Sequence, residues 1–211
     1  MINFVKQEII GLYQFLKRNF NEVVVLCSAA LFLSLHSYHQ IWNQWFSSLF
    51  YFAILPILVI FLLLRRSPLD YGFRLGRFGI WGRYVGVFCI IAALVLFFAN
   101  FSPELHKYYK IDNFNLVSYF LLTLATLFGS EFLFRGFLIF GLKDKFKETS
   151  ILIQMIPFVL VHFGKPELET LSTIVTGILF GYIVYRGNSF WPAFVIHMFI
   201  NIFFVASVNL F

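Results

Sequence analysis

The stretch FNLVSYFLLTLATLFGSEFLFRGFLIFG, residues 114–141, decides the fold of this chain. It is long enough to cross a bilayer, because a membrane helix needs roughly 20 mainly apolar residues. It nevertheless carries Glu131 and Arg135 inside the apolar run. A charge near the bilayer centre costs at least about 2.5 to 3.5 kcal/mol on insertion scales, so such residues usually serve a pathway or a reaction. The stretch therefore predicts a membrane helix that carries part of a functional site.

The composition of the whole chain agrees with a membrane protein. Of its 211 residues, 60% are hydrophobic and only 12% are charged, whereas soluble domains contain roughly 25% charged residues. A water-soluble fold of this length would have too few charges to cover its surface. The sequence predicts an all-α membrane bundle that forms one domain, residues 1–211. About seven spans are expected, over residues 22–39, 46–64, 79–101, 114–141, 150–164, 168–186 and 191–210.

Three local features refine this bundle. The fifth span is short and contains Pro157, so we expect it to be kinked or buried among its neighbours. Gly177 and Gly181 on the sixth span form a small-xxx-small pair, which favours close packing against another helix. Ahead of the first span, residues 1–20 alternate apolar and charged side chains with a helical period. They predict an amphipathic helix that lies on the membrane surface.

Basic residues are distributed unevenly between the two sides of this bundle. Twelve Lys and Arg residues fall on the side of the amino terminus and three on the opposite side. By the positive-inside rule, the amino terminus lies in the cytoplasm and the carboxyl terminus outside. The net charge of +6 does not indicate nucleic-acid binding, because the charges lie in short loops beside apolar runs and form no long basic face. The expected partner is membrane lipid.

Three of the predicted spans direct polar side chains into the membrane. Glu131 and Arg135 are four residues apart and share one helix face, as do His197 and Asn201, while His162 lies in the short fifth span. Each group alone has a structural explanation: a self-neutralising ion pair, a satisfied core histidine or an interhelical hydrogen bond. Together they favour one shared, water-accessible pocket, because a common site is the cheapest way to solvate them all.

Such a pocket would hold the groups that hydrolysis needs. A base or a metal ion activates water, and hydrogen-bond donors stabilise the oxyanion that forms on a carbonyl group. Glu131, His162 and His197 are also candidate ligands for a tetrahedral Zn²⁺ site whose fourth ligand is water. The sequence leaves the metal-free and the zinc-dependent mechanisms open.

Three short motifs in the last four spans resemble those of the CPBP intramembrane proteases, a family that includes the type II CAAX prenyl endopeptidases and bacteriocin self-immunity proteins. SEFLFRG, residues 130–136, looks like the first motif, Glu-Glu-x-x-x-Arg. FVLVH, residues 158–162, matches Phe-x-x-x-His, and HMFIN, residues 197–201, matches His-x-x-x-Asn. The motifs occur in the family's order, and the resemblance covers about residues 114–210.

The resemblance implies an activity and a role for each matched residue. It implies an endopeptidase of a bacterial or archaeal plasma membrane, a glutamate-type or metal-dependent enzyme that uses an activated water to cleave a membrane-anchored or hydrophobic peptide. His162 would help to activate that water. His197 and Asn201 would stabilise the oxyanion, and Arg135 would hold the Glu131 carboxylate.

One residue departs from the family pattern. Ser130 stands where the family has its first glutamate, which is usually assigned as the catalytic base, and an unassisted hydroxyl is no base at neutral pH. Glu131 is the nearest substitute, although the adjacent Arg135 weakens it as a base. Glu167 and Glu169, just after the second motif, are the other candidates.

Two further functions fit the sequence. The loss of the first glutamate is typical of a catalytically impaired relative that acts as a membrane scaffold or a bacteriocin-immunity protein. A small proton-coupled transporter that uses Glu131 and the histidines as a relay is the other alternative, although no internal repeat of the kind common in transporters is visible.

Overall fold

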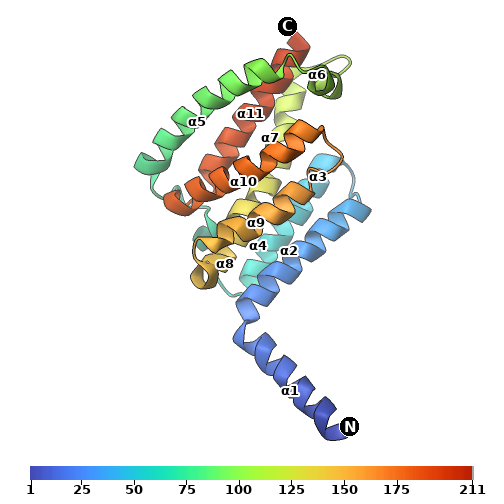
Figure 1. The fold of residues 1–211 in the computed structure, drawn as a ribbon, viewed down its shortest axis with the longest axis vertical. Coiled ribbons are helices and arrows are strands. Elements are labelled where there is room, and N and C mark those ends of the chain that lie inside the picture. Colours follow the sequence, from blue (N-terminus) through green and yellow to red (C-terminus); the bar gives the residue numbers. More distant parts are fainter. Residues whose placement is uncertain (211) are drawn as a thin grey trace.

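The chain folds into an all-helical bundle with no strand among the residues described (Figure 1). The computed structural model describes residues 1–210, without the side chain of Ile2. Phe211, the last residue of the expected domain, lies outside the described residues. The elements are α1 (Ile2–Arg18), α2 (Phe20–Tyr38), α3 (Gln44–Leu49), η1 (Phe50–Ile54), α4 (Leu55–Leu62), η2 (Pro68–Tyr71), α5 (Phe78–Ala99), α6 (Pro103–Tyr109), α7 (Leu116–Glu131), η3 (Phe132–Leu138), α8 (Ile139–Phe146), α9 (Thr149–Leu160), α10 (Glu167–Gly187) and α11 (Trp191–Leu210).

Six helical segments in residues 1–210 are long and apolar enough to cross a membrane. They correspond to the first four and the last two predicted spans, and they cover Phe20–Tyr38, Gln44–Leu62, Phe78–Ala99, Leu116–Phe146, Glu167–Gly187 and Trp191–Leu210. The fifth predicted span is the shorter apolar helix α9, which has 12 residues and a length of about 18 Å. A turn containing His162 follows it and leads into α10.

The arrangement of the helices places the two described ends of the chain far apart. Figure 1 shows α1 projecting from one end of the bundle, while the carboxyl end of α11 lies at the other. Nearly all side chains of α1 are exposed, as expected for a surface helix. Its contact with lipid and the orientation of the bundle stay predictions.

The core of the bundle surrounds the π-helix η3, which continues α7 directly. All seven residues of η3 are buried, including Phe132, Arg135 and Phe137. A π-helix interrupts the regular hydrogen-bond pattern of an α-helix and often occurs at a functional site. Here it carries the charged Arg135 into the centre of an apolar cluster formed by α2, η1, α9 and α10.

The predicted close packing of the sixth span occurs between α10 and α9. A Cβ atom on Gly181 would lie 2.7 Å from the side chain of Ile151, and one on Gly177 would lie 3.0 Å from Met155. The Gln154 amide of α9 donates hydrogen bonds of 2.9 Å to the carbonyls of Gly177 and Ile151. The small-residue pair therefore holds α9, and with it the turn that carries His162, against α10.

Gly129 makes the contact between α7 and α3 possible, and we expect Gly129→Ala to lower the free energy of unfolding by about 1 to 3 kcal/mol. The new Cβ would lie 2.6 Å from the backbone carbonyl oxygen of Ser48, and backbone cannot move aside as a side chain can. Gly86→Ala is the matched control, because nothing lies within 4 Å of its Cβ position. Thermal unfolding in detergent compares the two variants, and equal midpoints would contradict this packing.

Candidate active site

The carboxylate of Glu131 is the centre of a buried polar network. Its side chain is fully buried at the end of α7. Nδ1 of His197 lies 2.6 Å from Oε1, and Nε of Arg135 lies 3.3 Å from Oε2. The expected pairing of Glu131 with Arg135 is present. His197, which lies on α11, contacts the same carboxylate. Oε1 thus has a hydrogen-bond partner, whereas Oε2 has the ionic contact with Arg135 and no hydrogen bond.

The Arg135 guanidinium is held by aromatic rings as well as by charge. Its central carbon lies 3.8 Å from the ring centroid of Phe158 and 5.5 Å from that of Phe180. A cation over an aromatic face is attracted by the ring, and the attraction grows when water is excluded. Phe158, the first residue of the second motif, therefore stabilises the charge of Arg135, the arginine of the first motif.

His162 has one ring nitrogen occupied and the other free. Nδ1 lies 2.7 Å from the carbonyl oxygen of Phe158, one turn earlier. A carbonyl oxygen only accepts hydrogen bonds, so Nδ1 must carry the proton, and in the neutral ring Nε2 then has a free lone pair. The ring also packs edge-on against Phe158, with centroids 4.7 Å apart. The side chain is therefore oriented to accept a hydrogen bond through Nε2.

His197 and Asn201 occupy one face of α11, one turn apart. The contact of His197 Nδ1 with Glu131 leaves Nε2 as its free nitrogen. The Asn201 side-chain oxygen accepts a hydrogen bond of 3.4 Å from the Tyr119 hydroxyl of α7. That bond orients the amide so that its NH₂ group remains available as a donor.

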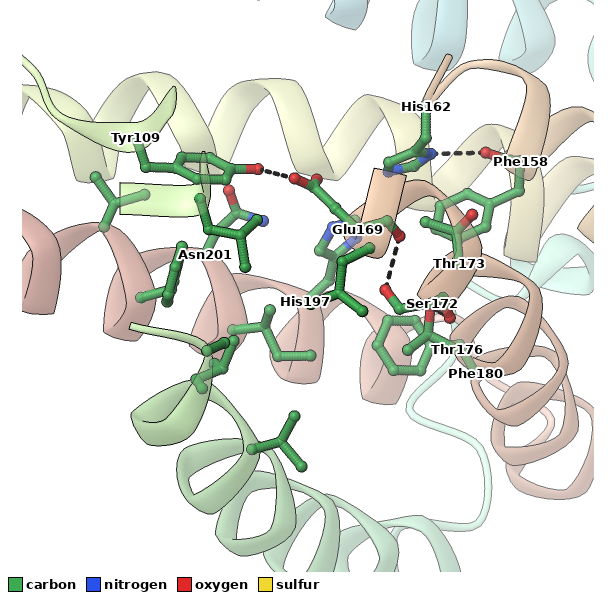
Figure 2. A pocket seen from close by; sticks show the side chains of 18 residues that line it. Tyr109, Phe158, His162, Glu169, Ser172, Thr173, Thr176, Phe180, His197 and Asn201 are labelled. Atoms are coloured by element: carbon green, nitrogen blue, oxygen red, sulfur yellow. Dashed lines mark hydrogen bonds between the residues drawn. The ribbon is translucent and has the colours of Figure 1, made fainter. Parts of the chain in front are cut away.

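A cavity of about 250 Å³ receives these side chains (Figure 2). His162, His197 and Asn201 all line it, whereas Glu131 and Arg135 lie behind His197 and do not. Most of the wall is apolar and comes from α5, α6 and α11, and a strip of hydroxyl groups comes from α10. The cavity combines a few polar groups with a large apolar surface, as ligand sites usually do. It has room for a water molecule beside a peptide bond.

The carboxylates considered as a replacement base lie in different surroundings. Glu131 is sealed from the cavity, and Glu167 is exposed at the start of α10. Glu169 lines the cavity. The hydroxyl of Ser130 donates to the carbonyl of Thr126 at 3.1 Å, and the residue does not reach the cavity wall. Of these positions, only 169 places a carboxylate in the wall of the cavity that the two histidines line.

The possible Zn²⁺ site at Glu131, His162 and His197 stays a prediction. Within residues 1–210, no group of three or more His, Cys, Asp or Glu side chains has the spacing needed to hold a metal ion. Oε1 of Glu131 faces His197 and Oε2 faces Arg135, so the carboxylate already balances the charge of a buried guanidinium.

Several site residues carry no signal in the sequence that sets them apart. Tyr119 lies in an apolar run of α7, and Tyr109 lies in the short helix α6, far from the motifs in sequence. Phe158 could be placed on the same face as His162, but its contact with Arg135 depends on how α9 meets η3. These contacts are tertiary, so only the folded chain shows them.

The long apolar helices make this an integral membrane protein, and its polar groups meet at one cavity inside the bundle. Residues 112–203 match the model of the family described as type II CAAX prenyl endopeptidase Rce1-like. This part of the chain is therefore an Rce1-like domain of the CPBP family, as the three motifs predict, and it contains all three of them. No curated protein and no solved structure gives a match.

Proposed function

We propose that this protein is an intramembrane endopeptidase that uses an activated water to hydrolyse a peptide bond of a membrane-associated substrate. The observation that carries the proposal is the position of His197: Glu131 holds it at 2.6 Å, and its ring faces the cavity that His162 and Asn201 also line. A buried carboxylate that orients an imidazole toward a reaction site is the arrangement used in catalytic triads.

The geometry supports a role for each of the three cavity-lining residues. The water donates a hydrogen bond to Nε2 of His162, and its oxygen then attacks the carbonyl carbon while a base in the cavity takes the other proton. The negative charge on the carbonyl oxygen is stabilised by the Asn201 amide and by His197, protonated at Nε2 and charge-balanced by Glu131. The C–N bond then breaks, and the proton passes to the leaving nitrogen.

The apolar wall favours a substrate that carries a hydrocarbon chain or hydrophobic side chains. The name of the matching family points to peptides with a prenylated cysteine three residues from the carboxyl end. The test uses proteoliposomes that contain the purified protein and a fluorogenic peptide of this type. A second peptide has the same sequence, an unmodified cysteine and an amino-terminal acyl chain as its anchor. Cleavage of either peptide supports the proposal, and the pair shows whether the prenyl group is required.

Asn201→Asp is expected to reduce kcat for the cleaved peptide by about 10²- to 10³-fold, the usual effect of losing one oxyanion donor. Aspartate keeps the size of the side chain and the oxygen that accepts from Tyr119, but it has no NH₂ group and adds a negative charge. KM is expected to change little, because the donor acts mainly in the transition state. Ser207→Asp, at a residue whose hydroxyl bonds within its own helix and which does not line the cavity, controls for a new charge on α11. A wild-type kcat in Asn201→Asp would show that Asn201 does not stabilise the oxyanion.

A second function, a family member that has lost catalysis, is favoured by one observation. The hydroxyl of Ser130 bonds to its own helix at Thr126 and offers nothing to the cavity. In that case wild-type protein cleaves neither peptide, while Ser130→Glu gains cleavage. The same assay therefore separates the two functions.

A further inference from the structure

Glu169 is the one acidic side chain among the described residues that line the cavity. It lies in the first turn of α10, and a fifth of its side chain is exposed (20%). Figure 2 shows its carboxylate turned into the cavity, between Tyr109 and His162 in that view. The adjacent Thr170 hydroxyl donates to the backbone carbonyl of His162 at 2.9 Å. The start of α10 and the turn that carries His162 are thus directly joined.

Two donors hold this carboxylate in place. The Tyr109 hydroxyl donates to Oε2 at 2.6 Å, and Nζ of Lys165 donates to Oε1 at 2.7 Å. A carboxylate accepts about four hydrogen bonds, so each oxygen retains a lone pair for a water molecule. Burial and the negative charge of Glu169 raise the pKa of Tyr109 far above its ordinary value of 10.0. The phenol therefore stays protonated at all working pH values and remains a donor to Glu169.

We propose that Glu169 is the general base of the peptidase, supplying the carboxylate that the first motif lacks at Ser130, and that Tyr109 of α6 positions it. The assignment rests on the proposed function. A water that donates one hydrogen to Glu169 and the other to Nε2 of His162 has its oxygen lone pair directed at the scissile carbonyl. The other two candidate carboxylates cannot hold a water molecule in the cavity, since Glu131 is sealed behind His197 and Glu167 is exposed outside the cavity.

The proton balance of the step is complete without another reactant. Glu169 takes one proton as the water oxygen bonds to the carbonyl carbon, and the carbonyl oxygen becomes an oxyanion. When the C–N bond breaks, the protonated Glu169 returns that proton to the leaving nitrogen, and the carboxylate is regenerated. The products are one carboxylic acid and one amine.

The test measures kcat and KM of Glu169→Gln in the proteoliposome assay. Glutamine keeps an oxygen that can accept from Tyr109, so the contact between α6 and α10 survives while the base is lost. We expect kcat to fall at least about 100-fold, KM to stay within about threefold, and the thermal midpoint to stay unchanged. Glu167→Gln, at the exposed neighbour, is expected to leave kcat at the wild-type value.

Two further variants separate a base from a structural contact. Tyr109→Phe removes the positioning hydrogen bond but keeps the carboxylate, so kcat is expected to fall only about tenfold. The double variant Ser130→Glu/Glu169→Gln removes the proposed base and restores the first glutamate of the first motif. Ser130 lies eleven residues after Tyr119, about three helical turns, so the two residues share the face of α7 on which Tyr119 meets Asn201. The Ser130 hydroxyl does not reach the cavity, but the side chain of glutamate is longer by two bonds. We expect this double variant to regain at least tenfold in kcat over Glu169→Gln.

The outcomes distinguish the two proposals. If wild-type protein cleaves the peptides and Glu169→Gln keeps a kcat within threefold of wild type, the assignment of Glu169 is wrong and the peptidase proposal stands. If Tyr109→Phe loses as much kcat as Glu169→Gln, the contact between α6 and α10 is what matters, and the assignment is again overturned. If neither the wild type nor any variant cleaves either peptide, the proposed function itself fails.

Discussion

His197→Ala is expected to lower kcat by about 10³-fold, within the range for a group that stabilises charge or transfers a proton in the transition state. The imidazole is the only part of the Glu131 network that reaches the cavity. Without it, the negative charge on the substrate oxygen has no partner beyond Asn201. The measurement is single-turnover cleavage in proteoliposomes, which separates the chemical step from substrate entry.

A more conservative variant shows whether this loss is chemical or structural. His197→Ala also leaves a buried Glu131 oxygen without its donor, which costs about 1 to 3 kcal/mol. In His197→Asn the amide nitrogen occupies nearly the position of Nδ1, so the hydrogen bond to Glu131 remains and only the Nε2 group is lost. We expect His197→Asn to be as inactive as His197→Ala but more stable. His39→Asn, at an exposed residue, is the control, and a wild-type kcat in His197→Asn would exclude a catalytic Nε2.

Glu131→Gln is expected to destabilise the bundle by about 3 to 5 kcal/mol and to abolish measurable cleavage. It leaves Arg135, whose side chain is fully buried, without its counter-charge, and breaking a buried pair on one side has costs of this size. The free energy of unfolding in mixed micelles measures the first effect, and the peptide assay measures the second.

The double variant Glu131→Leu/Arg135→Met separates these two effects. Replacing a buried ion pair by apolar residues of similar volume is often neutral or stabilising, so we expect the double variant to regain most of the lost stability. It is nevertheless expected to stay inactive, because His197 no longer has a carboxylate to orient it. Wild-type kcat in a stable double variant would show that the pair only serves folding.

The sequence predicts the outline of the bundle well, because hydrophobic length is a local property. The ranges of six spans, the pairing of Glu131 with Arg135 and the packing at Gly181 can all be read from spacing. The short fifth span could be recognised as unusual, although its actual end before His162 depends on the turn that α10 and its Thr170 hydroxyl stabilise.

The remaining features of the site depend on contacts between elements that are distant in sequence. The π-helix η3 has no separate signal in its apolar sequence, and the rings of Phe158 and Phe180 that its Arg135 meets come from other helices. Position 169 could be named as one candidate among three carboxylates, but choosing it requires Tyr109, which is 60 residues away. Spacing within one helix cannot supply such information.

If the protein is the peptidase proposed above, the helix α5 sets the route by which a substrate reaches the cavity. Its carboxyl-terminal turns form part of the cavity wall, yet no residue of its most apolar window is buried inside the bundle. In the proposed peptidase, a hydrophobic peptide dissolved in the bilayer would reach the cavity past this weakly buried helix, by lateral diffusion and without passing through water. The reaction should then follow surface-dilution kinetics: at constant bulk concentration, adding inert lipid lowers the rate, because the protein responds to the mole fraction of substrate in the bilayer.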